Sequence, residues 1–131
     1  MSDEIFLLSK EEYEKHKKNI PVVNNWWWLR SPGYSSRSTA YVDLDGSVDF
    51  FGYYVGNDSD SVRPALQILN HNFKVGDRFI EADFPWIVIS ENIAIAEVPI
   101  AFRRFDPSSN DYQNSEIRKF LLDWYKERKR K

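Results

Sequence analysis

The most prominent feature of the hydrophobic pattern is the apolar run Trp26-Trp27-Trp28-Leu29, which leads through Arg30-Ser31 into the turn pair Pro32-Gly33. An apolar run of this length that ends at Pro-Gly predicts a buried strand. Side chains alternate between the two faces of a strand, so tryptophan lies on both faces and Arg30 shares a face with Trp28. A strand that is covered on both faces is expected at the centre of its sheet.

The pattern predicts two helices, one near each end of the chain. Ser9-Lys10-Glu11-Glu12 has the spacing of a capping box and predicts a helix from about Lys10 to Lys18, with Tyr13 facing inwards. A second helix should follow a cap at Asn114 or Ser115. Its apolar stripe has helical spacing and consists of Ile117, Phe120, Leu121, Trp124 and Tyr125.

Between the helices the chain alternates short apolar runs with turn signals. Asp45-Gly46 predicts a hairpin of the runs 40–44 and 47–51, and Ser90-Glu91-Asn92 predicts another between 86–89 and 93–96. Val62–Leu69 is expected to be a strand with Pro64 at an edge or bulge, followed by a strand over Phe73–Ile80. These elements predict an α+β fold with two helices and a mostly antiparallel, twisted sheet.

Composition limits the class of protein. A chain of 131 residues is expected to be a single domain with a core of its own, and because it has no cysteine it offers no thiol nucleophile, disulfide or thiolate zinc site. It has no apolar run long enough for a membrane span, and Met1-Ser2-Asp3-Glu4 does not resemble a signal peptide. We therefore expect a cytoplasmic protein, with a place in a virion as the alternative.

Charge is distributed unevenly along the chain. The tail 126–131 carries a net charge of +4, and because the whole chain carries −2, residues 1–125 carry −6. This overall charge does not favour nucleic acid. Aromatic residues make up 16% of the chain, and although most of them should be core residues, some are available for stacking on a partner.

Two arginine-proline elements resemble a known family. Trp27-Trp28-Leu29-Arg30-Ser31-Pro32 and Val62-Arg63-Pro64-Ala65-Leu66 are similar to the WLRSP and VRPAL elements of an uncharacterised domain family of bacteria and phages. The resemblance implies a C-type-lectin-like fold and no established activity. It also implies that Trp27, Trp28, Arg30, Arg63 and Pro64 are structural signature residues.

The order of these elements departs from the family. A WxVL strand and an SxxRxWL helix precede VRPAL in the family, whereas the similar segments here, Trp86–Ile89 and Ser115–Leu121, follow it. This resembles a circular permutation, which is possible because natural termini often lie close together. One domain over 1–131 would then comprise a signature half (1–69), strands and the C-terminal helix (73–125), and the basic tail (126–131). A permuted joint predicts a hairpin of Val62–Leu69 with Phe73–Ile80.

The sequence does not indicate a catalytic site. His16 and His71 lie in unrelated polar segments, and neither a phosphate-binding glycine loop nor a metal-binding His-Glu spacing occurs. We therefore expect no enzyme, no metal and no cofactor. Asn57, Asp58 and Asp60 could supply oxygen ligands to calcium, but a solvated acidic loop is the favoured interpretation.

The sequence favours a non-enzymatic binding module whose ligand is a protein or a glycan, and the family resemblance implies an association with a phage or mobile element. Aromatic side chains beside polar groups predict the binding surface, and its candidate residues are Tyr34, Arg37, Tyr53, Tyr54, Asn57, Asp58 and Asp60. The alternative is an intracellular protein that docks an acidic partner or nucleic acid through its basic tail. The pattern is compatible with a monomer or a homodimer.

The signature arginines lie inside apolar strands, where a solvated charge is not expected. A buried guanidinium needs several hydrogen-bond acceptors. We predict that Arg30 and Arg63 bind carboxylates, backbone carbonyls or tryptophan faces, and that Arg30 lies over Trp28 or reaches a carboxylate. The alternative makes Arg30 a ligand contact. Most of the core is predicted to come from Trp27 or Trp28, Leu29, Leu66, Trp86, Val88, Ile117, Phe120, Leu121 and Trp124.

Overall fold

A computed structural model describes residues 3–69 and 72–129. In this part of the chain the strands form two five-stranded sheets rather than one. The first sheet is antiparallel throughout, and its order is β1 (Ile5–Phe6), β6 (Ala65–Gln67), β9 (Ile93–Ala96), β8 (Phe84–Ser90) and β7 (Arg78–Glu81). The hairpin predicted between β8 and β9 is confirmed.

The second sheet is organised around the tryptophan strand. Its order is β10 (Ala101–Phe102), β5 (Ser61–Val62), β2 (Trp27–Pro32), β3 (Ser38–Val42) and β4 (Val48–Tyr54). The pairs are antiparallel except for β2 with β5, which is parallel. Strand β2 is therefore central, as predicted, and the hairpin across Asp45-Gly46 is confirmed as β3–β4.

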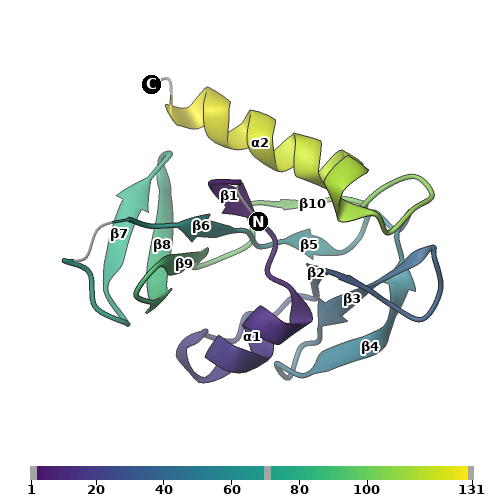
Figure 1. Cartoon of the computed structure of the whole chain (residues 1–131), viewed down its shortest axis with the longest axis horizontal. Coiled ribbons are helices and arrows are strands. Elements are labelled where there is room, and N and C mark those ends of the chain that lie inside the picture. The colour runs from purple at the N-terminus through teal and green to yellow at the C-terminus, as the bar shows by residue number, and fades with distance from the viewer. Residues whose placement is uncertain (1–2, 70–71, 130–131) are drawn as a thin grey trace.

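One helix lies on each side of the two sheets (Figure 1). Helix α1 (Lys10–His16) has the predicted capping box of Ser9 with Glu12 and continues into a 3₁₀ turn, η1 (Lys17–Asn19). Helix α2 (Glu116–Lys129) follows the 3₁₀ turn η2 (Tyr112–Asn114), and the hydroxyl of Ser115 accepts the amide of Arg118. Figure 1 shows α2 crossing above the strands and α1 lying below them.

The predicted hairpin of Val62–Leu69 with Phe73–Ile80 is wrong. Arg63 and Pro64 interrupt the first segment, so that β5 belongs to one sheet and β6 to the other. Strand β6 pairs with β1 and β9, whereas β7 begins only at Arg78 and pairs with β8. Asn70 and His71 of the predicted turn lie outside the described residues. The pairings of β6 and β7 therefore do not support the hairpin that a circular permutation predicts.

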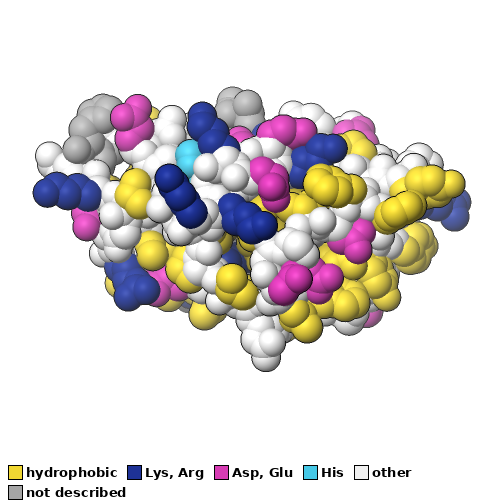
Figure 2. Space-filling model, turned by 90° about the horizontal axis from the view of Figure 1, so that it is seen from below, with side chains coloured by type: hydrophobic (Ala, Val, Ile, Leu, Met, Phe, Trp, Pro, Cys, Tyr) yellow, Lys and Arg dark blue, Asp and Glu magenta, His cyan; other side chains and the backbone are white. Residues whose placement is uncertain are grey.

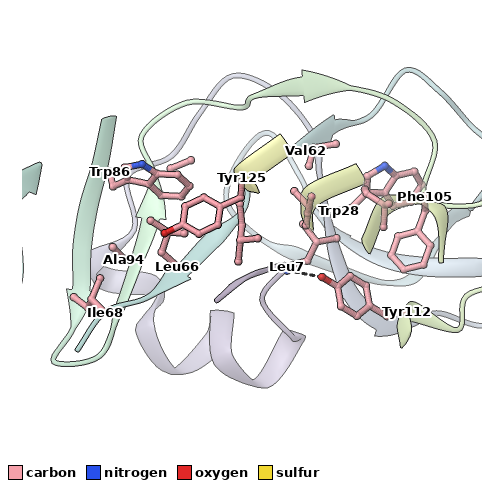
Figure 3. Packing of buried hydrophobic residues seen from close by; sticks show 14 of the residues in the cluster. Leu7, Trp28, Val62, Leu66, Ile68, Trp86, Ala94, Phe105, Tyr112 and Tyr125 are labelled. Carbon is pink, nitrogen blue, oxygen red and sulfur yellow. Dashed lines mark hydrogen bonds between the residues drawn. The ribbon is translucent and has the colours of Figure 1, made fainter. Parts of the chain in front are cut away.

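Two hydrophobic clusters form the core, and strand alternation divides the tryptophans of β2 between them. Trp28 packs in the cluster under α2 with Leu7, Leu66 and Trp86 (Figure 3). Trp27 packs with Leu29 in the cluster on the α1 side, where its ring contacts Tyr13 edge-on at 5.4 Å between centroids. Both faces of β2 are thus covered, as the sequence predicted.

The apolar stripe of α2 is buried less evenly than the sequence predicted. Ile117, Leu121 and Tyr125 are buried, whereas Phe120 and Trp124 are only partly buried and pack against the edge of the cluster. Arginine side chains cover these two rings, since Arg103 lies over Phe120 and Arg128 over Trp124. Within the described residues, no helix is long and apolar enough to cross a membrane.

Candidate functional site: an aromatic edge strand

Strand β4 forms one edge of the second sheet and contains a large bulge. In its register with β3, Thr39 lies opposite Tyr53 and Tyr41 opposite Asp49, so the single residue Ala40 faces residues 50–52. The carboxylate of Asp49 holds the bulge from within, because it accepts the Gly52 amide at 3.1 Å and the Tyr41 hydroxyl at 3.0 Å. Bulges redirect side chains and are common beside functional sites.

Gly52 is required by the geometry of the bulge. Its φ is +82°, and a Cβ at this position would lie 2.7 Å from the carbonyl oxygen of Thr39. Side chains other than glycine are strained at this φ, and the backbone atom that they would meet cannot rotate away. Glycine therefore lets β4 remain paired with β3 on both sides of the bulge.

We expect Gly52→Ala to destabilise the protein by about 2 kcal/mol or more, since it adds a backbone clash to an unfavourable φ. Gly76→Ala is the matched control, because Gly76 also has a positive φ, +95°, but a Cβ added there would meet no atom within 4 Å. Urea denaturation measures both variants. Equal losses of unfolding free energy in the two variants would show that the close approach of β3 to Gly52 does not contribute to the destabilisation.

The bulge and its neighbours place five large aromatic side chains in solvent. Their exposed fractions lie between 37% and 80%, and they are Tyr34, Phe50, Phe51, Tyr53 and Tyr54, which we call the β4 aromatic surface. The Tyr34 and Phe51 rings lie 5.6 Å apart, and the Tyr34 amide donates to Phe51 O at 2.8 Å. Figure 2 shows hydrophobic side chains gathered on the right of the molecule, the side on which β3 and β4 lie in Figure 1.

A second group of rings continues this surface towards β2. Trp26, which is partly buried, stacks on Tyr41 at 5.3 Å between centroids and meets Tyr53 at 5.5 Å. Tyr41 and Tyr53 are 6.0 Å apart in an edge-on arrangement. We call these three residues the Trp26 cluster. Tyr53 on β4 is thus the member of the β4 aromatic surface that packs on Trp26, whereas Tyr34 packs on Phe51.

Asp60 is a buried carboxylate with no partner in the described part of the chain. Its residue is 1% exposed, and neither carboxylate oxygen has a hydrogen-bond donor among the described residues. In the parallel pairing of β5 with β2, Ser61 lies opposite Trp27, which places Asp60 beside Trp26 on the same face of the sheet. Burial raises the pKa of Asp60 to about 7.

The charge of Asp60 also affects the Trp26 cluster. Burial raises the pKa of Tyr41, the hydrogen bond to Asp49 raises it further, and the negative charges of Asp49, Asp43 and Asp60 add to the effect. The Asp60 carboxylate is therefore close enough to Tyr41 to act on its hydroxyl. A buried carboxylate with a strongly shifted pKa that lies beside an exposed surface is a candidate functional group.

The structure brings together only some of the predicted ligand-binding residues. Tyr34, Tyr53 and Tyr54 lie on the β4 aromatic surface, and Arg37 is exposed in the turn before β3. Asn57 turns inwards within its own loop, where its side-chain oxygen accepts the amide and the hydroxyl of Ser59. The two acidic residues of the loop differ in exposure, because Asp58 is exposed to solvent and Asp60 is buried.

The loop residues considered as calcium ligands lie in different environments. In the described part of the chain, no group of three or more histidine, cysteine or acidic side chains could hold a metal ion. The interpretation of 57–60 as a solvated acidic loop is right for Asp58 but wrong for Asp60. The burial of Asp60 depends on the pairing of β5 with β2 and β10, and the local sequence does not specify this pairing.

Arg30 joins three elements of the scaffold. Its Nη1 donates to Leu7 O at 2.7 Å and to Glu12 Oε1 at 2.6 Å, and its side chain is 19% exposed. Of the two predicted partners, Arg30 thus has the carboxylate and not the Trp28 ring, since the ring beneath the guanidinium is that of Phe6, at 5.8 Å. Burial alone would raise the pKa of Glu12, but the hydrogen bonds from Arg30 and Ser9 hold it below its ordinary value.

Arg63 is completely buried at the junction of the two sheets. Its guanidinium donates to three backbone carbonyls, those of Ala96 at 2.7 Å, Pro21 at 2.8 Å and Glu97 at 3.4 Å. It also lies 5.2 Å from the centroid of the Trp27 ring. Burial lowers the pKa of Arg63 to about 10, so it remains charged at neutral pH. Both arginines thus have the internal partners that the sequence predicted.

Sequence reasoning missed two of the five residues of the β4 aromatic surface, Phe50 and Phe51. The pattern predicts a regular strand over Phe50 and Phe51, in which one of two adjacent rings would be buried. Instead their exposed fractions are 59% and 73%. The available signal was Gly52 directly after two adjacent phenylalanines, because glycine inside a strand often marks a bulge.

The fold and this surface define a mixed α+β domain with an exposed aromatic edge strand. The chain belongs to a domain family of unknown function, DUF6273, which matches residues 1–69. No curated protein and no solved structure gave a match. The matched part contains both arginine-proline elements and the whole β4 aromatic surface.

Proposed function

We propose that this protein is a binding module that recognises a ligand through the β4 aromatic surface. The observation that carries the proposal is the exposure of five large aromatic side chains on and beside a single edge strand. Contiguous apolar patches are uncommon on monomeric proteins and mark interaction sites, and aromatic side chains are enriched at such sites. The bulge supports the proposal, because Asp49 and Gly52 hold two phenylalanines outwards.

The scaffold beneath the surface suits a binding role. Arg30 ties β2 to α1 and to the segment after β1, and Arg63 joins the two sheets, so both signature arginines support the framework. A rigid framework reduces the entropy lost on binding. A lectin-like relationship, a phage or mobile-element origin and a cytoplasmic location remain parts of the same proposal.

The alternative function, docking of an acidic partner through the basic tail, has less support. Arg128 donates to the carbonyls of Ala82 and Asp83, and Lys129 pairs with Glu4 at 3.7 Å. These two cations already have partners within the chain, whereas the aromatic side chains of β4 are open to solvent. We therefore place the ligand at β4.

A paired variant tests the proposal. We expect Tyr34→Ser with Phe51→Ser to lower affinity at least about tenfold for ligands selected from a glycan array and a displayed peptide library. The free energy of unfolding should stay within about 0.5 kcal/mol, because both side chains are exposed. Ile80→Ser with Phe102→Ser is the matched control, since these residues are 71% and 59% exposed away from β4.

The control variant should bind as the wild type does. Ligands that bind the wild type and the Tyr34/Phe51 variant equally well would overturn the proposal, and so would a library from which neither peptides nor glycans are selected. Unfolding measured on the same samples separates a lost contact from a lost fold.

A further inference from the structure

The β3–β4 region has an excess of negative charge, which Arg104 near Asp58 and Lys17 near Asp45 offset only in part. Residues 37–60 contain five aspartates but only one arginine and no lysine. The ion pairs of the described residues lie elsewhere and include Arg30–Glu12, Arg103–Glu116 and Arg118–Asp3, and none contains an aspartate of this segment. The segment therefore offers negative charge to a partner.

Hydrogen bonding distinguishes Asp60 from the other four aspartates. Asp43, Asp45 and Asp49 accept hydrogen bonds from nearby amide or hydroxyl groups, and Asp58 is exposed to water. Asp60 is enclosed and has no donor among the described residues. A buried polar group without a partner costs free energy and requires an explanation. Two acceptor oxygens call for a hydrogen-bond donor, and a cation is the donor that also compensates the charge.

The rings beside Asp60 are suited to the same kind of group. Trp26 is its neighbour across β5 and β2, and Tyr41 and Tyr53 pack against Trp26. Aromatic faces attract ammonium and guanidinium groups, with tryptophan the most effective. Tyr53 is 37% exposed and Trp26 partly so, which gives the cluster a side open to solvent.

We propose that the ligand of the β4 aromatic surface is a basic protein segment, and that one of its lysine or arginine side chains docks beside the Trp26 cluster to pair with Asp60. This inference rests on the proposed binding function and names its partner class. The apolar side chains of the segment cover Phe51 and Tyr34. Its remaining cations face Asp43, Asp45 and Asp58. Entry to Asp60 requires a displacement of the Trp26 or Tyr53 ring, because the carboxylate is enclosed in the free protein.

Charge argues against the other macromolecular ligands. An acidic partner or the phosphates of a nucleic acid would meet the exposed carboxylates of Asp45 and Asp58 and would be repelled. A neutral glycan could stack on the rings but would leave Asp60 without a cation. A basic segment alone uses both the rings and the charge.

Selection from random linear peptides displayed on phage tests the inference, with the whole chain as the target. We expect the selected peptides to be enriched in lysine and arginine and to bind more weakly at higher salt. Asp60→Asn should lower their affinity about tenfold or more, whereas Glu91→Gln, which removes an exposed charge at the turn between β8 and β9, should change it less than twofold.

The outcomes separate this inference from the proposed function. Neutral or acidic peptides that still require Phe51 would overturn the basic partner and leave the β4 surface as the binding site. Basic peptides that bind Asp60→Asn as well as the wild type would overturn the role of Asp60. Binding of every selected peptide without regard to Phe51 would overturn both proposals. A melting curve of Asp60→Asn confirms that the variant is folded.

Discussion

Replacement of Arg63 by alanine is expected to lower the free energy of unfolding by about 3–5 kcal/mol. The substitution leaves the carbonyls of Ala96, Pro21 and Glu97 without their donor and opens a cavity beneath Trp27. Buried acceptors that lose a charged donor are costly, and a void in a packed core adds to the loss. Because both costs fall on one residue, Arg63→Ala should destabilise the protein more than Gly52→Ala does.

Urea denaturation measures this loss directly. Arg63→Lys should also destabilise the protein, since an ammonium cannot reach three carbonyls in the planar arrangement of a guanidinium. Arg37→Ala, at an exposed arginine of the turn before β3, is the control and should change stability by less than about 0.5 kcal/mol. A loss below about 1 kcal/mol for Arg63→Ala would show that Arg63 does not hold the two sheets together.

The second large effect has the opposite sign, because Asp60→Asn should stabilise the protein above neutral pH. The pKa of Asp60 is about 7 in the folded protein against a usual value of 3.8. Below pH 3.8 the group is protonated in both states. As the pH rises towards 7, the unfolded chain loses the proton while the folded protein keeps it, so stability falls over this interval and then levels off.

Asparagine has no charge to bury and avoids this fall. We expect Asp60→Asn to gain roughly 2–4 kcal/mol at about pH 8 and little at about pH 4. Urea denaturation of both proteins at the two pH values provides the test. A gain independent of pH, or a loss at about pH 8, would show that Asp60 is not an unpaired buried carboxylate. A variant that is more stable yet binds more weakly is the expected sign of a functional residue.

Local signals in the sequence were sufficient for much of the fold. The Ser9–Glu12 capping box, the Asp45-Gly46 turn and the tryptophan run before Pro32-Gly33 each depend on neighbouring residues, and each was predicted correctly. The distribution of strands between two sheets was not predictable in this way. Strand β6 lies between β1 and β9, so its place depends on residues far away in the sequence.

Local signals also predicted part of the candidate site, whereas the features that depend on strand pairing were missed. Tyr34, Tyr53 and Tyr54 were correctly placed on an exposed surface, since rings beside turns and polar residues are seldom all buried. The exposure of Phe50 and Phe51 follows from the pairing of Asp49 with Tyr41 across two strands. The burial of Asp60 follows from its position between β2 and β10, a tertiary arrangement that the loop composition does not reveal.

The family match stops near the middle of the chain, but the structure does not divide there. Strand β6 from the matched part pairs with β9, and β5 pairs with β10, both from the later part. Helix α2 supplies Ile117, Leu121 and Tyr125 to the cluster that contains Trp28. Residues 1–69 alone would therefore leave β5 and β6 with one neighbouring strand each instead of two, and one face of the core uncovered.

Hydrogen exchange of the protein with and without the tightest selected peptide is the most direct test of the claim that β4 is the binding site. We predict that the peptide slows exchange in β4, in the turn before β3 and in the segment from Asp58 to Ser61. Exchange in β7 and α2 should not change. Protection confined to the cleft of about 710 Å³ near Ile68 and Phe79, with no change in β4, would contradict the account.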